Sequence, residues 1–219
     1  MRSLGICFSL IGSIFCIPAY AFDLQGHRGA RGLAPENTLA GFAVALSTGV
    51  STLELDLGVT KDGVVVISHD VRLNPDHTRG PDGKFLAVEG PAIRSLSYDE
   101  LKRYDVGRLK PGTKYATTFS KQKPQDRSVI PTVTEVFELA KRAKADHVRF
   151  NIETKITPTS GPDVVDPDTF AAAVVKVVRD AGLASRVTVQ SFDWRTLAGV
   201  KRIAPEIELV CLTFETANK

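Results

Sequence analysis

The sequence of 219 residues contains only three cysteines, one tryptophan and one methionine. Cys7 and Cys16 lie near the amino terminus, in a segment expected to be removed. Cys211 then has no partner for an internal disulfide, so the chain is not a disulfide-rich scaffold. A strong excess of charge of one sign is also absent, because 28 basic and 25 acidic residues give a net charge of +3. This balance gives no reason to expect nucleic acid or acidic membranes as partners.

The sequence also lacks an apolar run long enough to cross a membrane. The run at residues 4–17 ends at Pro18, whereas a spanning helix needs about 20 apolar residues. Arg2 precedes this run and Ala19-Tyr20-Ala21 follows it, so residues 1–21 are predicted to be a secretory signal peptide. We therefore expect an exported protein, periplasmic or secreted, with no stable membrane anchor.

Residues 22–219 are enough for one domain with a substantial core. Strand-like apolar runs occur at 22–26, 52–57, 64–68, 148–152, 187–190 and 207–212. Helices are predicted at 37–47, 132–143, 166–181 and 194–204. The alternation of nearly continuous apolar strands with helices favours an α/β fold with a parallel sheet or barrel.

Local signals mark where several of these elements begin. Asn37 is predicted to cap the first helix, Thr132 and Glu135 form a capping box, and Asp193 caps the last helix. Lys61-Asp62-Gly63 predicts a tight turn between the second and third strands.

The stretch at about 70–130 is too long for an ordinary strand-to-helix connection. It contains a turn-rich segment, a short helix capped by Ser97 with Glu100, and a basic polar section. We interpret it as an insertion after the third strand that covers the catalytic face and shapes substrate choice. The alternative is a surface elaboration without a role.

Side chains capable of chemistry stand where the predicted strands end. They are His27, Arg28, Glu54, Asp56, His69, Glu153, Lys155 and Gln190. The carboxyl ends of the strands of an α/β barrel share one face, which is where barrel enzymes carry their active sites. This mixture of acids, imidazoles and cations suits cleavage of a phosphate ester with the help of a metal ion.

The acidic residues have the character of metal ligands. Glu54 and Asp56 are two apart on a strand, so their side chains point the same way. Buried together they repel each other, and a divalent cation would compensate for this. Glu153 can complete a site of three oxygen ligands, which favours Ca²⁺ or Mg²⁺ over zinc. Alternatively, the acids pair with Arg28 and Lys155 without a metal.

Two of the four histidines are candidates for proton transfer. His27 and His69 follow strand ends, and one imidazole can take a proton while the other gives one, each transfer contributing about 10²–10⁴-fold in rate. His77 and His147 are interpreted as structural residues, because neither closes a strand beside a carboxylate.

The remaining candidates are expected to act on the substrate. Arg28 and Lys155 can hold phosphate oxygens. Gln190 can hydrogen-bond the substrate or brace another ligand. Glu36 either orients Arg28 or caps the first helix.

Together the motifs resemble those of the glycerophosphodiester phosphodiesterase family, whose members are TIM-barrel enzymes. The matching segments are His27-Arg28-Gly29, Pro35-Glu36-Asn37-Thr38, Glu54-x-Asp56, His69-Asp70, Glu153-x-Lys155 and Gln190-Ser191-Phe192, all in family order. They extend from about Leu24 to Leu212. The insertion, with its Leu96-Ser97-x-x-Glu100-Leu101 segment, is similar to that of the exported bacterial type.

The resemblance implies a role for each matching residue. His27 and His69 would be the general acid and base, in either order, and a divalent cation, Ca²⁺ or Mg²⁺, would mediate hydrolysis. The remaining roles are metal ligation by Glu54, Asp56 and Glu153, and substrate binding by Arg28, Lys155, Glu36 and Gln190. The substrate would be a small glycerophosphodiester, split into sn-glycerol 3-phosphate and an alcohol in glycerophospholipid or glycerol metabolism.

One departure from this family concerns the number of strands. A complete TIM barrel has eight strands and about 250 residues, whereas six strands are predicted here. Unpaired sheet edges favour association into oligomers or misfolding. The alternatives are therefore a truncated, non-catalytic barrel fragment, or a phospholipase-D-like phosphodiesterase acting on intact lipid. The lack of an apolar membrane-docking stretch disfavours the lipid enzyme.

Overall fold

The computed structural model describes residues 22–214, so the predicted signal peptide at 1–21 lies outside the described residues. The strands are β1 (Gln25–Gly26), β2 (Thr52–Val59), β3 (Val65–Ile67), β4 (Arg149–Thr154), β5 (Val187–Ser191) and β6 (Glu208–Cys211). The helices are α1 (Leu39–Ser47), α2 (Tyr98–Leu101), α3 (Lys114–Thr118), α4 (Val133–Arg142), α5 (Pro167–Asp180) and α6 (Trp194–Ile203). No helix within 22–214 is long and apolar enough to span a bilayer.

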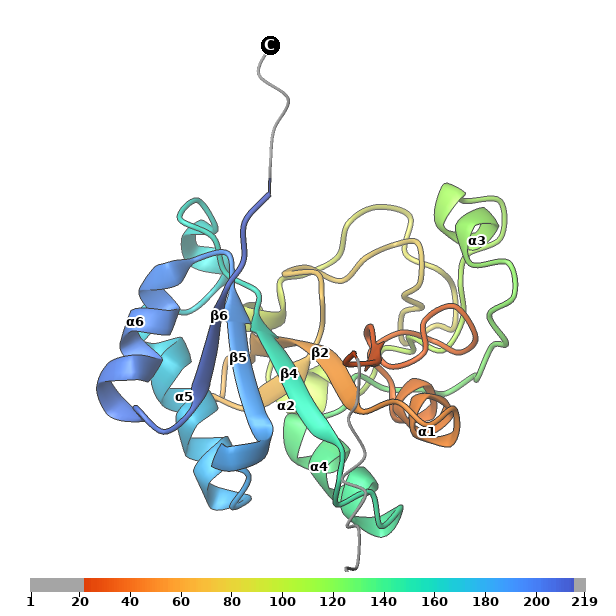
Figure 1. Cartoon of the computed structure of the whole chain (residues 1–219). Coiled ribbons are helices and arrows are strands. Elements are labelled where there is room, and N and C mark those ends of the chain that lie inside the picture. Colours follow the sequence, from red (N-terminus) through yellow and green to blue (C-terminus); the bar gives the residue numbers. More distant parts are fainter. Residues whose placement is uncertain (1–21, 215–219) are drawn as a thin grey trace, which may run out of the picture.

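Six strands form one sheet, as predicted, with helices packed along it (Figure 1). The order β1-β2-β4-β5-β6 follows the chain, and all four pairings on this path are parallel. This is the α/β arrangement expected of a (β/α) barrel. Within the described residues, β1 and β6 form the two edges and the sheet stays open.

Strand β3 follows β2 through the predicted tight turn and lies outside the parallel path of the sheet. It pairs antiparallel with the end of β2, from Leu57 opposite Ile67 to Val59 opposite Val65. The reversal comes from the predicted turn, where Gly63 adopts a φ of 82° that glycine tolerates without strain. Consequently β3 folds back along β2 as a hairpin and brings the residues after Ile67 beside Asp56, whose carbonyl accepts a hydrogen bond from Ser68 N–H at 2.9 Å.

The two faces of the sheet have different characters. Leu53, Leu55 and Leu57 of β2 are fully buried and belong to one core, together with Phe150 and Ile152 of β4. The same core includes side chains from α1, α4, α5 and α6. Because strand side chains alternate between faces, the intervening polar residues of β2 and β4 point to the opposite face. The apolar face holds the helices, and the polar face is left for chemistry.

The helix starts follow the capping signals, with one exception. Thr132 and Glu135 form the predicted capping box of α4, and Asp193 accepts a hydrogen bond from Arg195 N–H at the start of α6. The prediction that Asn37 caps α1 was wrong, because Thr38 accepts the capping hydrogen bond from Gly41 N–H. Asn37 instead has a φ of 52°, and its side chain turns away to the site described below.

Gly29 is essential to the loop that follows β1. Its φ is 80°, and a Cβ atom there would stand 2.8 Å from the backbone carbon of Gly41. We expect Gly29→Ala to lower the free energy of unfolding by about 3 kcal/mol, combining backbone strain with a clash against α1. Chemical denaturation measures this. Gly49→Ala is the matched control, since its φ is 79° with no atom near the added Cβ, and should cost about 1 kcal/mol. If both variants lost the same unfolding free energy, a clash at Gly29 would be contradicted.

Candidate active site

The loop after β1 is folded around the carboxylates of β2. Arg28 adopts a φ of 54°, and its backbone N–H donates to Glu54 Oε2 at 2.8 Å. The N–H of Asn37 donates to the Arg28 carbonyl at 3.0 Å, and its side-chain amide donates to Asp56 Oδ2 at 2.9 Å. These contacts hold His27 and Arg28 beside the ends of β2 and β4.

Glu54, Asp56 and Glu153 converge as predicted. Each offers a carboxylate oxygen within 4.8 Å of the others, and all three side chains are buried. The register explains the meeting, since Asp56 lies directly opposite Glu153 on β4. Burial, followed by repulsion from the Asp56 carboxylate, raises the pKa of Glu54. Three acids at this distance are therefore stable as anions only beside compensating positive charge.

Two cations supply part of that charge. Arg28 Nη1 donates to Glu36 Oε1 at 2.9 Å, and Arg28 Nε lies 3.4 Å from Asp56 Oδ2. Lys155 Nζ lies 2.8 Å from Glu153 Oε1 and 3.7 Å from Asp56 Oδ1. Of the two roles considered for Glu36, orienting Arg28 is the one observed.

The donor set fits a divalent cation. With Glu36 the cluster contains four carboxylates, and two cations, Arg28 and Lys155, form ion pairs with them. Asp56 Oδ1 is also buried without a hydrogen-bond donor, which in a native site indicates a missing ion or water. Carboxylate oxygens alone are the ligands of hard divalent cations. The acidic trio can thus bind a metal ion even though both predicted ion pairs are present.

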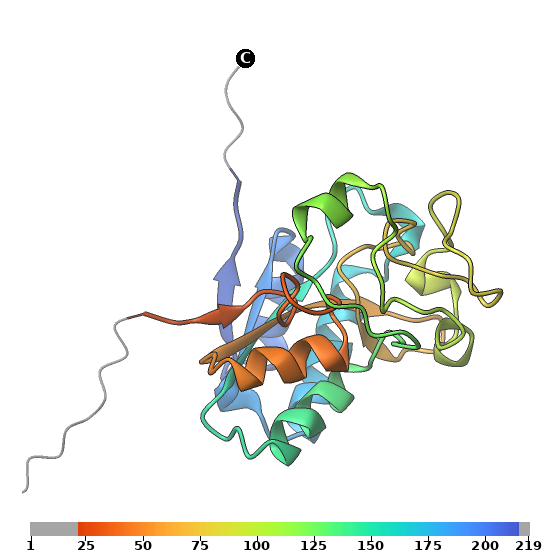
Figure 2. The same cartoon turned by 90° about the vertical axis from the view of Figure 1, so that its right-hand side faces the viewer.

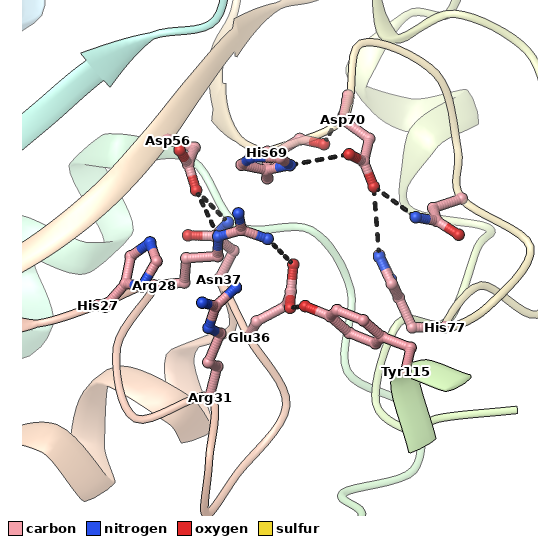
Figure 3. Close-up of polar contacts among 12 residues, drawn as sticks. His27, Arg28, Arg31, Glu36, Asn37, Asp56, His69, Asp70, His77 and Tyr115 are labelled. Atoms are coloured by element: carbon pink, nitrogen blue, oxygen red, sulfur yellow. Dashed lines mark hydrogen bonds and ion pairs between the residues drawn. The ribbon is translucent and has the colours of Figure 1, made fainter. Parts of the chain in front are cut away.

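Both candidate histidines lie at this cluster. His27 Nε2 is 3.8 Å from Glu54 Oε2, with about half of its side chain exposed. Burial, followed by the charges of Arg31 and Arg28, lowers the pKa of His27 to about 4. His69 Nδ1 lies 2.8 Å from Asp70 Oδ1. Figure 3 shows both imidazoles beside the Arg28–Asp56 contact.

Asp70 is a site residue to which sequence reasoning assigned no role. Besides His69, it accepts a hydrogen bond from Asn74 Nδ2 at 2.7 Å and lies 3.6 Å from His77 Nε2 (Figure 3). Although its burial would favour the neutral acid, hydrogen bonds from these neighbours hold the pKa of Asp70 well below its usual range. The ionised Asp70 fixes the ring of His69. His77, interpreted from sequence as structural, is thus connected to the site.

Tyr115 is a second residue that sequence reasoning missed. It comes from α3, and its hydroxyl donates to Glu36 Oε2, the carboxylate that also binds Arg28. Figures 1 and 2 show α3 and its neighbouring loops beside the loop that follows β1. Lys123 N–H also donates to the Leu33 carbonyl at 2.8 Å. No local pattern indicates Tyr115, because its partner is 79 residues away.

Gln190 braces a carboxylate. Its Nε2 donates to Glu54 Oε1 at 3.3 Å, while Asn151 Nδ2 donates to Gln190 Oε1 at 3.1 Å. This contact places Gln190 where it can brace Glu54, a predicted metal ligand.

The sequence of the chain also matches a known protein family. Residues 27–219 match the model of the glycerophosphoryl diester phosphodiesterase family, which covers most of the chain. The chain belongs to that family. This confirms the resemblance carried by the strand-end motifs.

Individual members of the family can be compared with the chain. A glycerophosphodiester phosphodiesterase of Caldanaerobacter subterraneus is 31% identical over 183 residues, which is 84% of this chain and 63% of the relative. A family protein of known crystal structure from Silicibacter pomeroyi is 33% identical with a TM-score of 0.80, covering 87% of this chain and 64% of that one. The chain therefore spans somewhat less than two thirds of the length of these relatives.

One related structure contains a reaction product. A phosphodiesterase of Oleispira antarctica was solved with the product sn-glycerol 3-phosphate. It is 28% identical to this chain with a TM-score of 0.62, and the match covers 86% of this chain and 65% of that chain.

Proposed function

We propose that the chain is a metal-dependent glycerophosphodiester phosphodiesterase that produces sn-glycerol 3-phosphate and a free alcohol, in glycerophospholipid or glycerol metabolism. One observation carries the proposal. Glu54, Asp56 and Glu153 converge on the polar face of the sheet, beside two cations and two imidazoles, in a member of this family. The product found in the Oleispira antarctica relative supports the same substrate class.

The acidic trio would hold Ca²⁺ or Mg²⁺. Such a cation, when bound, neutralises phosphate charge and lowers the pKa of a hydroxyl or water near it. Bracing of Glu54 by Gln190 and by the backbone of Arg28 presents the carboxylate oxygens in a fixed geometry. A preformed arrangement of this kind reduces the reorganisation that reaction would otherwise require.

The basic residues would bind the phosphodiester. Arg28 is held by Glu36 so that its planar guanidinium stays at the site, and Lys155 adds a second positive charge. His27 and His69 would transfer the protons, one removing a proton from the attacking hydroxyl or water and the other protonating the leaving oxygen. In this way the bond between phosphorus and the alcohol oxygen breaks, and the alcohol leaves neutral. Attack by water gives sn-glycerol 3-phosphate directly, whereas attack by a glycerol hydroxyl gives a cyclic phosphate that water then opens to the same product.

We also propose that residues 70–130 form the insertion that shapes the substrate site, and that the chain is exported. The contacts of Asp70, His77 and Tyr115 with site residues support a role for the insertion. Export is supported by the sequence pattern of residues 1–21. Association of the chain through its open sheet edges is a further expectation.

A coupled assay for sn-glycerol 3-phosphate tests the activity. Purified chain is incubated with glycerophosphocholine, glycerophosphoethanolamine or glycerophosphoglycerol, with Ca²⁺, with Mg²⁺, or with a chelator. We expect release with at least one cation, a fall of at least about 100-fold with the chelator, and recovery when the cation is returned. A folded chain that releases no product with either cation would refute the activity. Release unaffected by the chelator would refute the metal dependence.

A further inference from the structure

Arg31 is a third cation at the site, on the same loop as Arg28. Its guanidinium carbon lies 4.8 Å from the centre of the Phe119 ring, a cation–π contact. Its carbonyl accepts a hydrogen bond from Gln122 Nε2 at 2.8 Å. Figure 3 shows the side chain directed toward Arg28 and Glu36. Residues of the 70–130 segment thus hold Arg31 at the edge of the phosphate site.

Arg31 differs from the other two cations in its partners. Arg28 and Lys155 each form ion pairs with buried carboxylates. Within residues 22–214, the guanidinium of Arg31 has no ion pair or hydrogen bond, and its contact is the aromatic ring. Burial, followed by repulsion from Arg28, lowers the pKa of Arg31, yet it stays charged at neutral pH. Its five N–H donors are therefore available to a ligand.

The position of Arg31 places those donors next to the predicted chemistry. A hollow of about 380 Å³ runs between the loop that follows β1 and the end of α1. Its lining includes His27, Arg31 and Phe119, with Ala45, Thr48 and Val50 along the α1 side. His27 is the acid or base candidate, so a group attached to the scissile phosphate can extend from His27 past Arg31. The Phe119 ring offers no oxygen acceptor, so the cation–π contact leaves the N–H groups of Arg31 for a ligand.

We propose that Arg31 binds an anionic group carried by the alcohol part of the substrate, a phosphate monoester or a carboxylate. The inference rests on the proposed function and specifies its substrate class. A planar guanidinium matches phosphate and carboxylate oxygens with two parallel hydrogen bonds. The same charge repels the trimethylammonium of a choline alcohol. Arg31 therefore favours glycerophosphodiesters with an additional negative charge over those with a neutral or cationic alcohol.

Matched substrates test the inference, because each pair differs in one anionic group. The pairs are glycerophosphoinositol 4-phosphate with glycerophosphoinositol, and glycerophosphoserine with glycerophosphoethanolamine. For each pair, selectivity is the ratio of the two kcat/KM values. We expect Arg31→Gln to lower this selectivity about tenfold, which corresponds to one charge-assisted contact.

Two further variants serve as a support and a control. Phe119→Leu should lower the selectivity about threefold, because the guanidinium of Arg31 loses its aromatic contact. Arg202→Gln, on the far side at α6, removes an exposed charge and should leave selectivity within twofold.

The outcomes separate this inference from the proposed function. If Arg31→Gln lowered kcat/KM equally for both members of a pair, Arg31 would contact the scissile phosphate. If Arg31→Gln left the selectivity unchanged, Arg31 would have no role in substrate choice. Either result overturns the inference and leaves the proposed activity intact. Calorimetric binding of the same compounds provides a second measurement that needs no turnover. Were the wild-type chain inactive but its binding preference lost in Arg31→Gln, the function would fail and the inference would stand. Circular dichroism confirms that each variant is folded.

Discussion

Replacing His69 by alanine is expected to lower kcat by at least about a thousandfold, with a much smaller change in KM. Its Nδ1 lies 2.8 Å from Asp70 Oδ1, which fixes the ring beside the cluster that we propose binds the phosphate. A positioned acid or base contributes about 10²–10⁴-fold, and loss of the ring leaves the leaving or attacking oxygen without a proton partner. Steady-state kinetics under saturating cation measures the effect.

Two further variants make this result specific. Asp70→Asn keeps the shape but removes the charge that orients His69, so we expect a loss of about 10–100-fold. His147→Ala removes an exposed histidine outside the site, and its kcat should stay within twofold of the wild type. If His69→Ala retained more than a tenth of the activity, His69 would not be a proton-transfer residue.

Glu54→Gln is expected to abolish activity and to make the cation-free protein more stable. The pKa of Glu54 is raised by burial and by Asp56, so the folded protein holds a proton there that the unfolded chain has released. The free energy of unfolding therefore falls as pH rises above the ordinary glutamate pKa of about 4.3. Glutamine has nearly the same shape without the charge, and should raise stability at neutral pH by about 1–3 kcal/mol.

Denaturant unfolding with a chelator present measures the stability of the cation-free protein, and the product assay measures the activity. Stability and activity must change in opposite directions, because the carboxyl group that has to take up a proton in the cation-free fold is the one that ligates the cation. Thr188→Val serves as a control on the same polar face of the sheet, at a position outside the acidic trio. A Glu54→Gln protein that was both less stable and fully active would contradict the assignment of Glu54 as a ligand.

Much of the fold followed from sequence because its signals are local. Apolar runs defined the strands, and the capping residues Thr132 and Asp193 marked where helices begin. The tight turn predicted at Lys61-Asp62-Gly63 accounts for the antiparallel direction of β3, because strands joined by a tight turn run in opposite directions. Asn37 looked like a helix cap by type and position. Its actual partner, Asp56, is 19 residues away, and that contact depends on tertiary structure.

The site was predictable to a similar extent. The side chains that end the strands converge because the carboxyl ends of parallel strands share one edge, as with Glu54, Asp56 and Glu153. By contrast, Tyr115 and His77 come from a long segment without regular periodicity. Their positions depend on how that segment folds back over the β1 loop, and no spacing rule reports this.

The central claim is that Glu54, Asp56 and Glu153 surround one bound divalent cation. Calorimetric titration of Ca²⁺ and Mg²⁺ into chelator-treated protein tests it most directly. The predicted result is saturable binding of one cation per chain, lost when any one of the three carboxylates is changed to its amide. Absence of binding by the folded wild-type chain, or equal binding by the three amide variants, would contradict the claim.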